Sequence, residues 1–264
     1  MLRRIAPLMA ALVLVAGCAG TAKLTQKSEE KLASGDHWRA WQLATRALDR
    51  EPGNPRARDA ATAAGASIAD EWQRRIHATA ALDSLDAAEQ VLAFVEFRAG
   101  AVRYATIPTP AGWPDEERAL RRAAARTHYA DGVAANDSRR PKQAYLAFRA
   151  TERFVPNYRD AAKLADRAYE KALTRVAVVP FRAHGEHAPL GTQVAEAWRT
   201  DLSQALTPTN ASFTRMMGGD DIERTMTVSQ LDGLSRDEAV ALGRKAGAQR
   251  VVWGSVGGVK SATR

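Results

Sequence analysis

The chain has 264 residues, with 38 Lys and Arg against 30 Asp and Glu, so its formal net charge is +8. This length is sufficient for one large domain or two modest ones. The basic residues are spread through the chain and form no dense run with interleaved aromatic residues, which argues against a nucleic-acid-binding protein.

The first 18 residues have the pattern of an export signal. Arg3 and Arg4 precede an uncharged run over residues 5–17, and small residues come just before Cys18, the only cysteine. The apolar run is shorter than the roughly 20 residues that a membrane-spanning helix needs. A basic start, a short apolar core and small residues at a cut site are typical of a cleaved signal peptide over residues 1–17.

The sequence Leu14-Val15-Ala16-Gly17-Cys18 resembles the lipobox of bacterial lipoproteins. The resemblance implies cleavage before Cys18, followed by acylation of its thiol and its new amine with fatty acids such as palmitate. Ala19 stands where an aspartate would be the usual inner-membrane retention signal, so the resemblance favours the outer membrane, with the rest of the chain in the periplasm. Residues 18–24 are then a lipid anchor and a short polar tether. The alternative is an ordinary cleaved signal in which Cys18 has no role.

Residues 25–174 have an almost continuously helical pattern. Alanine, leucine, arginine and glutamate dominate this part, and all four are good helix formers. Turn-forming residues interrupt it at intervals that fit pairs of helices. The breaks fall at Gly35-Asp36, Pro52–Pro55, Gly100, Pro108–Pro114, Asn136–Pro141 and Val155–Asn157.

Two of the helical segments share one spacing of small or apolar residues followed by proline. The steps are four, three and five residues, so the first three positions lie on one helix face and the proline ends the helix. This pattern resembles the second helix of a tetratricopeptide repeat, which implies a degenerate helix-pair array; an irregular helical bundle is the alternative. The two sets are Ala40, Ala44, Ala47 and Pro52, and Ala144, Phe148, Thr151 and Pro156.

The hydrophobic pattern changes at Arg175, where residues 175–264 favour a small α/β domain. Val176–Phe181 is a short apolar run typical of a buried strand, and Val194, Trp198, Leu202 and Leu206 recur as on the buried face of a helix. A weaker strand is expected over Ala211–Met216, followed by a short helix from Gly218. Ser235 and Glu238 form a capping-box pattern for a helix that ends at Gly247, and the last strand is expected over Val251–Val256. The fold class is therefore α+β in two parts: a helix-pair array, then a three-layer domain with a short parallel or mixed sheet.

The strand at Arg175–Phe181, Arg215 and the A-x-x-L-G-x-x-x-G-A-x-x-V-V-x-G pattern over Ala239–Gly254 resemble CsgG-like lipoproteins. Their relatives include the TolB amino-terminal domain and lipoprotein activators of penicillin-binding proteins. The resemblance implies that the paired valines fill a central strand. Family members continue into further strands and a helix, whereas this sequence ends at Arg264, so the domain is expected to be minimal, shortened or completed by partner strands. Secretion pores of the family use membrane-spanning hairpins, and this sequence is too short to contain them.

No convincing catalytic or metal-binding set occurs, so we expect neither an enzyme nor a cofactor or metal. Ser255 lies in an incomplete nucleophile-elbow pattern that lacks the first glycine. His184, Glu186 and His187 lack the helical spacing of a zinc site, and a solvated loop is the simpler interpretation.

The sequence therefore predicts a lipid-anchored adaptor at the periplasmic face of the outer membrane. Its partners would be envelope proteins or peptides of cell-wall synthesis or secretion machinery. The candidate partner-binding residues are Trp38 and Trp41, which line either a core or a groove, and Val251 and Trp253, which lie on an edge open to strand addition. One alternative is a homo-oligomeric subunit of a CsgG-related secretion complex. Another is a periplasmic enzyme acting on wall polymers, for which no pair of carboxylates was found.

Overall fold

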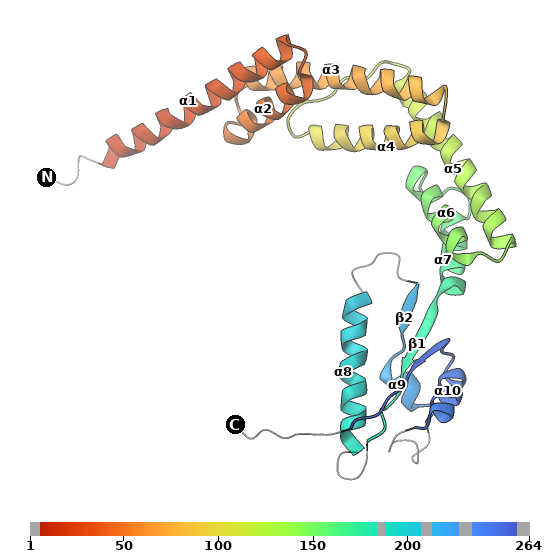
Figure 1. The fold of residues 1–264 in the computed structure, drawn as a ribbon. Helices are drawn as coiled ribbons and strands as arrows, with labels where there is room; N and C mark the ends of the chain where they lie inside the picture. Colours follow the sequence, from red (N-terminus) through yellow and green to blue (C-terminus); the bar gives the residue numbers. More distant parts are fainter. Residues whose placement is uncertain (1–5, 184–187, 207–212, 227–233, 258–264) are drawn as a thin grey trace. The chain divides into compact units, whose positions relative to one another are not determined.

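The computed structural model describes residues 6–183, 188–206, 213–226 and 234–257, and side chains from Gly20 onward (Figure 1). These residues form an α+β fold that is mostly helical, with ten helices and a three-stranded parallel sheet. Contacts divide the chain into two compact units. Unit 1 comprises Met1–Ala130 and Arg149–Ala161, and unit 2 comprises Asp131–Phe148 and Ala162–Arg264.

The helices of the first part begin and end close to the predicted breaks. The capping residues explain several of the starts: the side chains of Asp36, Asn54 and Asp83 accept hydrogen bonds from backbone N–H groups in the first turns of α2, α3 and α4. The helices are α1 (Ala6–Ala33), α2 (His37–Arg50), α3 (Pro55–Ala80), α4 (Ser84–Ala101), α5 (Trp113–Asp137), α6 (Pro141–Phe154) and α7 (Ala161–Ala172).

Helix α1 runs without a break through residues 18–24, the segment assigned from the sequence to a lipid anchor and short polar tether. Thr21 and Thr25 are buried, and the Thr25 hydroxyl donates to the Thr21 carbonyl at 3.1 Å. Farther along, the Ser28 hydroxyl donates to the Ala40 carbonyl of α2 at 2.7 Å. Short side chains on this face let α2 lie close to α1, and this packing keeps the segment helical.

No helix among the described residues has the length and apolar character needed to cross a membrane.

Both predicted small-residue faces are buried. In α2, Ala40, Ala44 and Ala47 have no exposed surface, and α1 and α3 pack against this helix. In α6, Ala144, Phe148 and Thr151 are buried to the same degree. A Cβ added at Gly132 of α5 would lie 2.6–2.9 Å from three ring atoms of Phe148, so the two helices approach each other more closely than a larger residue would permit.

The sheet has the strand order β2-β1-β3, and both pairings are parallel. Its strands are β1 (Thr174–Val178), β2 (Thr214–Met216) and β3 (Arg250–Val252), and its helices are α8 (Ala188–Leu206), α9 (Gly219–Glu223) and α10 (Arg236–Lys245). The Ser235–Glu238 capping box is present, and Gly247 has a φ of +83°, as expected of a helix stop. The strand–helix–strand–helices–strand order is therefore confirmed.

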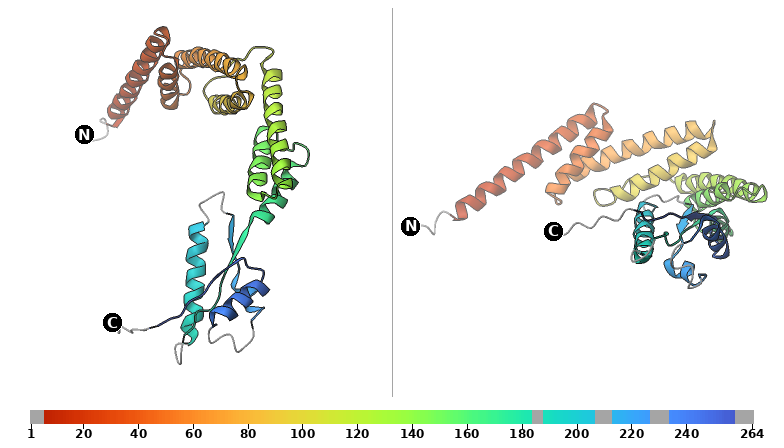
Figure 2. Two further views of the ribbon diagram at one scale, coloured as in Figure 1. Left: turned by 45° about the vertical axis from the view of Figure 1, so that its right-hand side comes forward. Right: turned by 60° about the horizontal axis from the view of Figure 1, so that its bottom comes forward.

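Side chains alternate between the two faces of the sheet and create three layers. Ala177 and Val251 pack with α9 and α10, whereas Val178 and Val252 pack with α8. The views in Figures 1 and 2 place α8 on one side of the sheet and α10 on the other.

Three details of this part differ from the sequence-based expectations. The central strand is β1, whereas β3 with its paired valines lies at an edge among the described residues, because β1 provides hydrogen-bonding partners on both of its sides. Strand β1 ends at Val178, and Phe181 N–H donates instead to the Gly191 carbonyl of α8. Trp198 was expected on the buried face of α8 but is 51% exposed, since Ala195 occupies the contact with the sheet.

Candidate functional site

The candidate anchor residue Cys18 lies in the backbone of α1, and its side chain is outside the described residues. The packed part of the chain begins only two residues later. A Cβ added at Gly20 would lie 3.1 Å from a guanidinium nitrogen of Arg50, at the end of α2, and Thr21 is already 2% exposed. An anchor at Cys18 would therefore connect to folded protein without an intervening flexible linker.

The two candidate tryptophans of unit 1 have different environments. Trp41 is 8% exposed and packs edge-on against Phe97 and Tyr104, with ring centroids 5.4 and 6.1 Å away. Trp41 is therefore a core residue, which was one of the two alternatives left open by the sequence. Trp38 also contacts Phe97 but remains 40% exposed, so a partner can reach only Trp38 of the two.

The loop between α4 and α5 fills the space beside Trp41. Residues 105–110 form no helix or strand, and Ile107 is buried against Gly65 of α3. A Cβ at Gly65 would overlap the Ile107 side chain and lie 3.2 Å from the Trp41 ring. The loop is thus part of the core of unit 1.

The candidate residues of the sheet edge lie in unit 2. Val251 is half-buried against Gly243 of α10. A Cβ at Gly243 would overlap the Val251 side chain, so glycine permits this close contact. Trp253 follows β3 and is 43% exposed, and its indole N–H donates to the Leu234 carbonyl at 2.7 Å. The two sheet residues belong to unit 2 and the two helix-pair tryptophans to unit 1.

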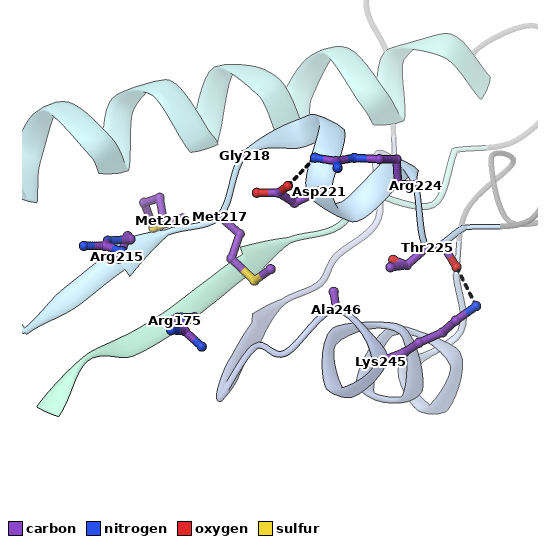
Figure 3. A pocket seen from close by; sticks show the side chains of 10 residues that line it. All are labelled: Arg175, Arg215, Met216, Met217, Gly218, Asp221, Arg224, Thr225, Lys245 and Ala246. Carbon is purple, nitrogen blue, oxygen red and sulfur yellow. Dashed lines mark hydrogen bonds and ion pairs between the residues drawn. The ribbon is translucent and has the colours of Figure 1, made fainter. Parts of the chain in front are cut away.

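A basic hollow in unit 2 was not identified from the sequence. It has a volume of about 470 Å³ and lies beside the start of β1, the end of β2 and the turn after it, helix α9 and the end of α10 (Figure 3). Its described lining residues include four cations and one carboxylate. They are Arg175, Arg215, Met216, Met217, Gly218, Asp221, Arg224, Thr225, Lys245 and Ala246.

The strand register explains how the arginines of this basic hollow come together. Arg175 of β1 and Arg215 of β2 are direct partners in the parallel ladder. Each approaches a carboxylate oxygen of Glu170, at 3.4 and 3.5 Å. The sequence does place one arginine in each of two predicted strands. It does not specify that these two strands pair, so it could not predict that the two arginines lie side by side.

A second hollow, in unit 1, is lined by a polar network whose groups are hydrogen-bonded to one another. Asp49 accepts hydrogen bonds from Arg103 at 2.7 Å and from the Tyr104 hydroxyl at 2.9 Å. Burial, and then the hydrogen bond to Asp49, raise the pKa of Tyr104 above its ordinary value. These groups satisfy one another, and we interpret them as structural.

Within the described parts of the chain, no group of three or more His, Cys, Asp and Glu residues is placed to hold a metal ion. The predicted loop of His184, Glu186 and His187 lies outside the described residues.

Comparisons of the chain with protein families, with curated proteins and with solved structures found no match.

Proposed function

We propose that the protein is a lipoprotein, acylated at Cys18 and anchored in the outer membrane, that acts as a non-enzymatic adaptor in a cell-envelope assembly. The observation that carries this proposal is the single cysteine at the end of the lipobox-like sequence Leu14–Cys18. The attachment of three acyl chains would be effectively permanent, since each buried methylene contributes about 0.8 kcal/mol.

The helical part supports the role of a binding module in this proposal. Helices α2 and α6 bury residues at the same spacing, and α1 and α5 supply short residues, Ser28 and Gly132, at the positions that face them. These features favour a degenerate tetratricopeptide-like array over residues 25–174. In this proposal the array binds a protein or peptide of the envelope.

The parallel sheet supports the second module. Its order of strands and helices is the one predicted from the hydrophobic pattern of residues 175–264, and Gly243 lies against Val251 within the most specific part of the CsgG-like pattern. In this proposal the domain over residues 175–264 binds a second envelope component, with Trp253 near the contact.

The anchor is tested by metabolic labelling with a palmitate analogue and by membrane fractionation. The unaltered chain is expected to be labelled and to sediment with outer membranes, whereas Cys18→Ser should lose the label. Ala19→Asp is a matched control in the adjacent position: it should keep the label but move to the inner membrane. Labelling of Cys18→Ser would refute acylation at this residue.

The adaptor role is tested by crosslinking in cells, followed by identification of the captured proteins. Capture of a cell-wall synthase or a secretion component, lost in Cys18→Ser, is the expected result. Capture of only a second copy of the chain would refute the adaptor role.

The edge position of β3 favours a second candidate, a homo-oligomeric subunit of a CsgG-related complex. A free edge can pair with a strand of another chain. Ring-shaped oligomers in detergent are the expected result for this candidate, and a monomer under the same conditions would exclude it.

A further inference from the structure

We infer that the basic hollow of unit 2 binds an organic phosphate or diphosphate, either as a free molecule or as a lipid headgroup. The inference rests only on this hollow and does not depend on the anchor or on the adaptor role. Its lining joins residues from four separate segments: Arg175 of β1, Arg215 of β2, Arg224 after α9 and Lys245 of α10 (Figure 3).

The cations that line the hollow outnumber the carboxylates that form ion pairs with them among the described residues. Arg175 and Arg215 are like charges paired across two strands, an arrangement that is unfavourable by itself. They share a single carboxylate, Glu170, at 3.4–3.5 Å, which is longer than a well-formed charged hydrogen bond. The shared and stretched contact leaves guanidinium N–H groups available to an anion.

The other two cations lie beside α9 and at the end of α10, and both are exposed. Arg224 pairs with Asp221 at 2.5 Å, and the Lys245 ammonium donates to the Thr225 carbonyl at 3.2 Å. A carbonyl satisfies one donor of the ammonium but does not neutralise its charge. Among the described residues, the ion pairs of the four lining cations therefore involve only two carboxylates, Glu170 and Asp221.

The volume of the hollow and its apolar lining residues favour organic phosphates over small inorganic anions. A volume of about 470 Å³ lies within the range of small-molecule sites and exceeds what inorganic phosphate alone would fill. Met217 and Ala246 provide apolar surface between the cations (Figure 3). Arginine forks match phosphate oxygens bidentately, and a surplus of two positive charges fits a dianion. An organic group carrying one or two phosphates satisfies all of these conditions.

The test is a calorimetric titration of the full chain, in an uncharged detergent, with pyrophosphate, phenyl phosphate and inorganic phosphate. We expect pyrophosphate and phenyl phosphate to bind, and phenyl phosphate to bind more tightly than inorganic phosphate because its ring covers Met217. Arg215→Gln and Lys245→Gln should each weaken binding by about tenfold, as expected for the loss of a charged hydrogen bond. Arg244→Gln is the matched control: it removes the same charge from the adjacent, exposed residue of α10 outside the lining, and it should bind like the unaltered chain.

Glu170→Gln provides a test in the opposite direction. Removal of the carboxylate that competes for Arg175 and Arg215 should tighten pyrophosphate binding by about threefold or more, because both guanidinium groups are then free for the ligand. A change that merely damaged the fold would weaken binding instead. Absence of binding at millimolar pyrophosphate and phenyl phosphate, or equal losses in Arg244→Gln and Lys245→Gln, would overturn the proposal.

Vesicles distinguish the two sources of the phosphate. The full chain with Cys18→Ser is mixed with phosphatidylcholine vesicles, with and without phosphatidic acid, and sedimented. Co-sedimentation that requires phosphatidic acid and is lost on Lys245→Gln, but not on Arg244→Gln, identifies a lipid headgroup. Binding of the soluble probes without such co-sedimentation identifies a free organic phosphate.

Discussion

The contact between Gly132 and Phe148 shows how single residues set the spacing of the helices. Phe148 is 1% exposed, and its ring lies where a side chain on Gly132 would begin. Gly132→Ala should therefore destabilise the protein by about 1–3 kcal/mol, because the overpacked ring must move. Gly100→Ala in α4 is the control: nothing lies within 4 Å of its Cβ, so alanine should be neutral or stabilising by up to about 1 kcal/mol. Urea denaturation measures both, and equal effects would contradict the packing argument.

The capping box of α10 predicts a dependence of stability on pH. The Ser235 hydroxyl donates to Glu238 at 2.6 Å, and this bond, followed by the Ser235 backbone N–H, lowers the pKa of Glu238 below its ordinary value of 4.5. The folded state then favours the carboxylate. Its stabilising effect is present above pH 4.5 and is lost as the pH falls through the lowered pKa. Glu238→Gln should remove this part of the acid-side slope in thermal denaturation.

Asp237→Asn is the control for that measurement, since it changes the neighbouring charge and leaves the capping hydrogen bonds in place. An acid-side slope that is unchanged in Glu238→Gln would contradict the assigned role of the capping box.

At the scale of elements, the loop between α4 and α5 places a buried side chain in the core of unit 1. Ile107 is 9% exposed and fills the space above Gly65, whereas Val102 in the same connection is 71% exposed. Ile107→Ala should cost about 2 kcal/mol or more of unfolding free energy, because it leaves a cavity beside Trp41. Val102→Ala should change it by less than about 0.5 kcal/mol. Chemical denaturation distinguishes the two, and a loss in Val102→Ala as large as that in Ile107→Ala would show that the loop as a whole is responsible.

Much of this element structure was predictable, for reasons visible in individual residues. Pro55 and Pro141 begin helices, Gly35 and Gly247 adopt positive φ, and Ser235 caps a helix, so strictly local chemistry defined those boundaries. The turn between α3 and α4 contains neither glycine nor proline, and only Asp83 marked it.

The exposure of Trp198 and the position of Ile107 depended on packing between segments far apart in sequence, which a local pattern does not contain. The basic hollow depended in the same way on the β1–β2 register, which brings Arg215 beside Arg175. Among the described residues Val251 lies in the edge strand β3 and Trp253 follows it, whereas the CsgG-like resemblance had implied a central strand.

At the scale of the whole molecule, aromatic packing connects the last helices to the sheet. Tyr145 of α6, Tyr169 of α7 and Phe213 before β2 form a cluster with ring centroids 5.2–5.9 Å apart, and all three lie in unit 2. Helix α7 ends and β1 begins around Leu173, near the predicted domain boundary. Tyr145 and Tyr169 precede this boundary in the sequence, whereas Phe213 follows it, so the aromatic cluster joins residues from both sides.

A chain of residues 175–264 should consequently be less stable than a chain of residues 131–264, by about 2 kcal/mol or more, because it loses both tyrosines that cover Phe213. Urea denaturation followed by circular dichroism measures the difference. Equal stability of the two chains would show that the α/β part folds independently of the helices before it.

The division of α5 and α6 between the two units has a consequence for how such a protein can evolve. Each unit is assembled from two separate stretches of the sequence, so the gene contains no single point at which one unit ends and the other begins. A recombination event that joins two genes at one position would transfer an incomplete core from each parent. Exchange of either half with another protein would require two coordinated crossovers, and we expect the two units to have been inherited together.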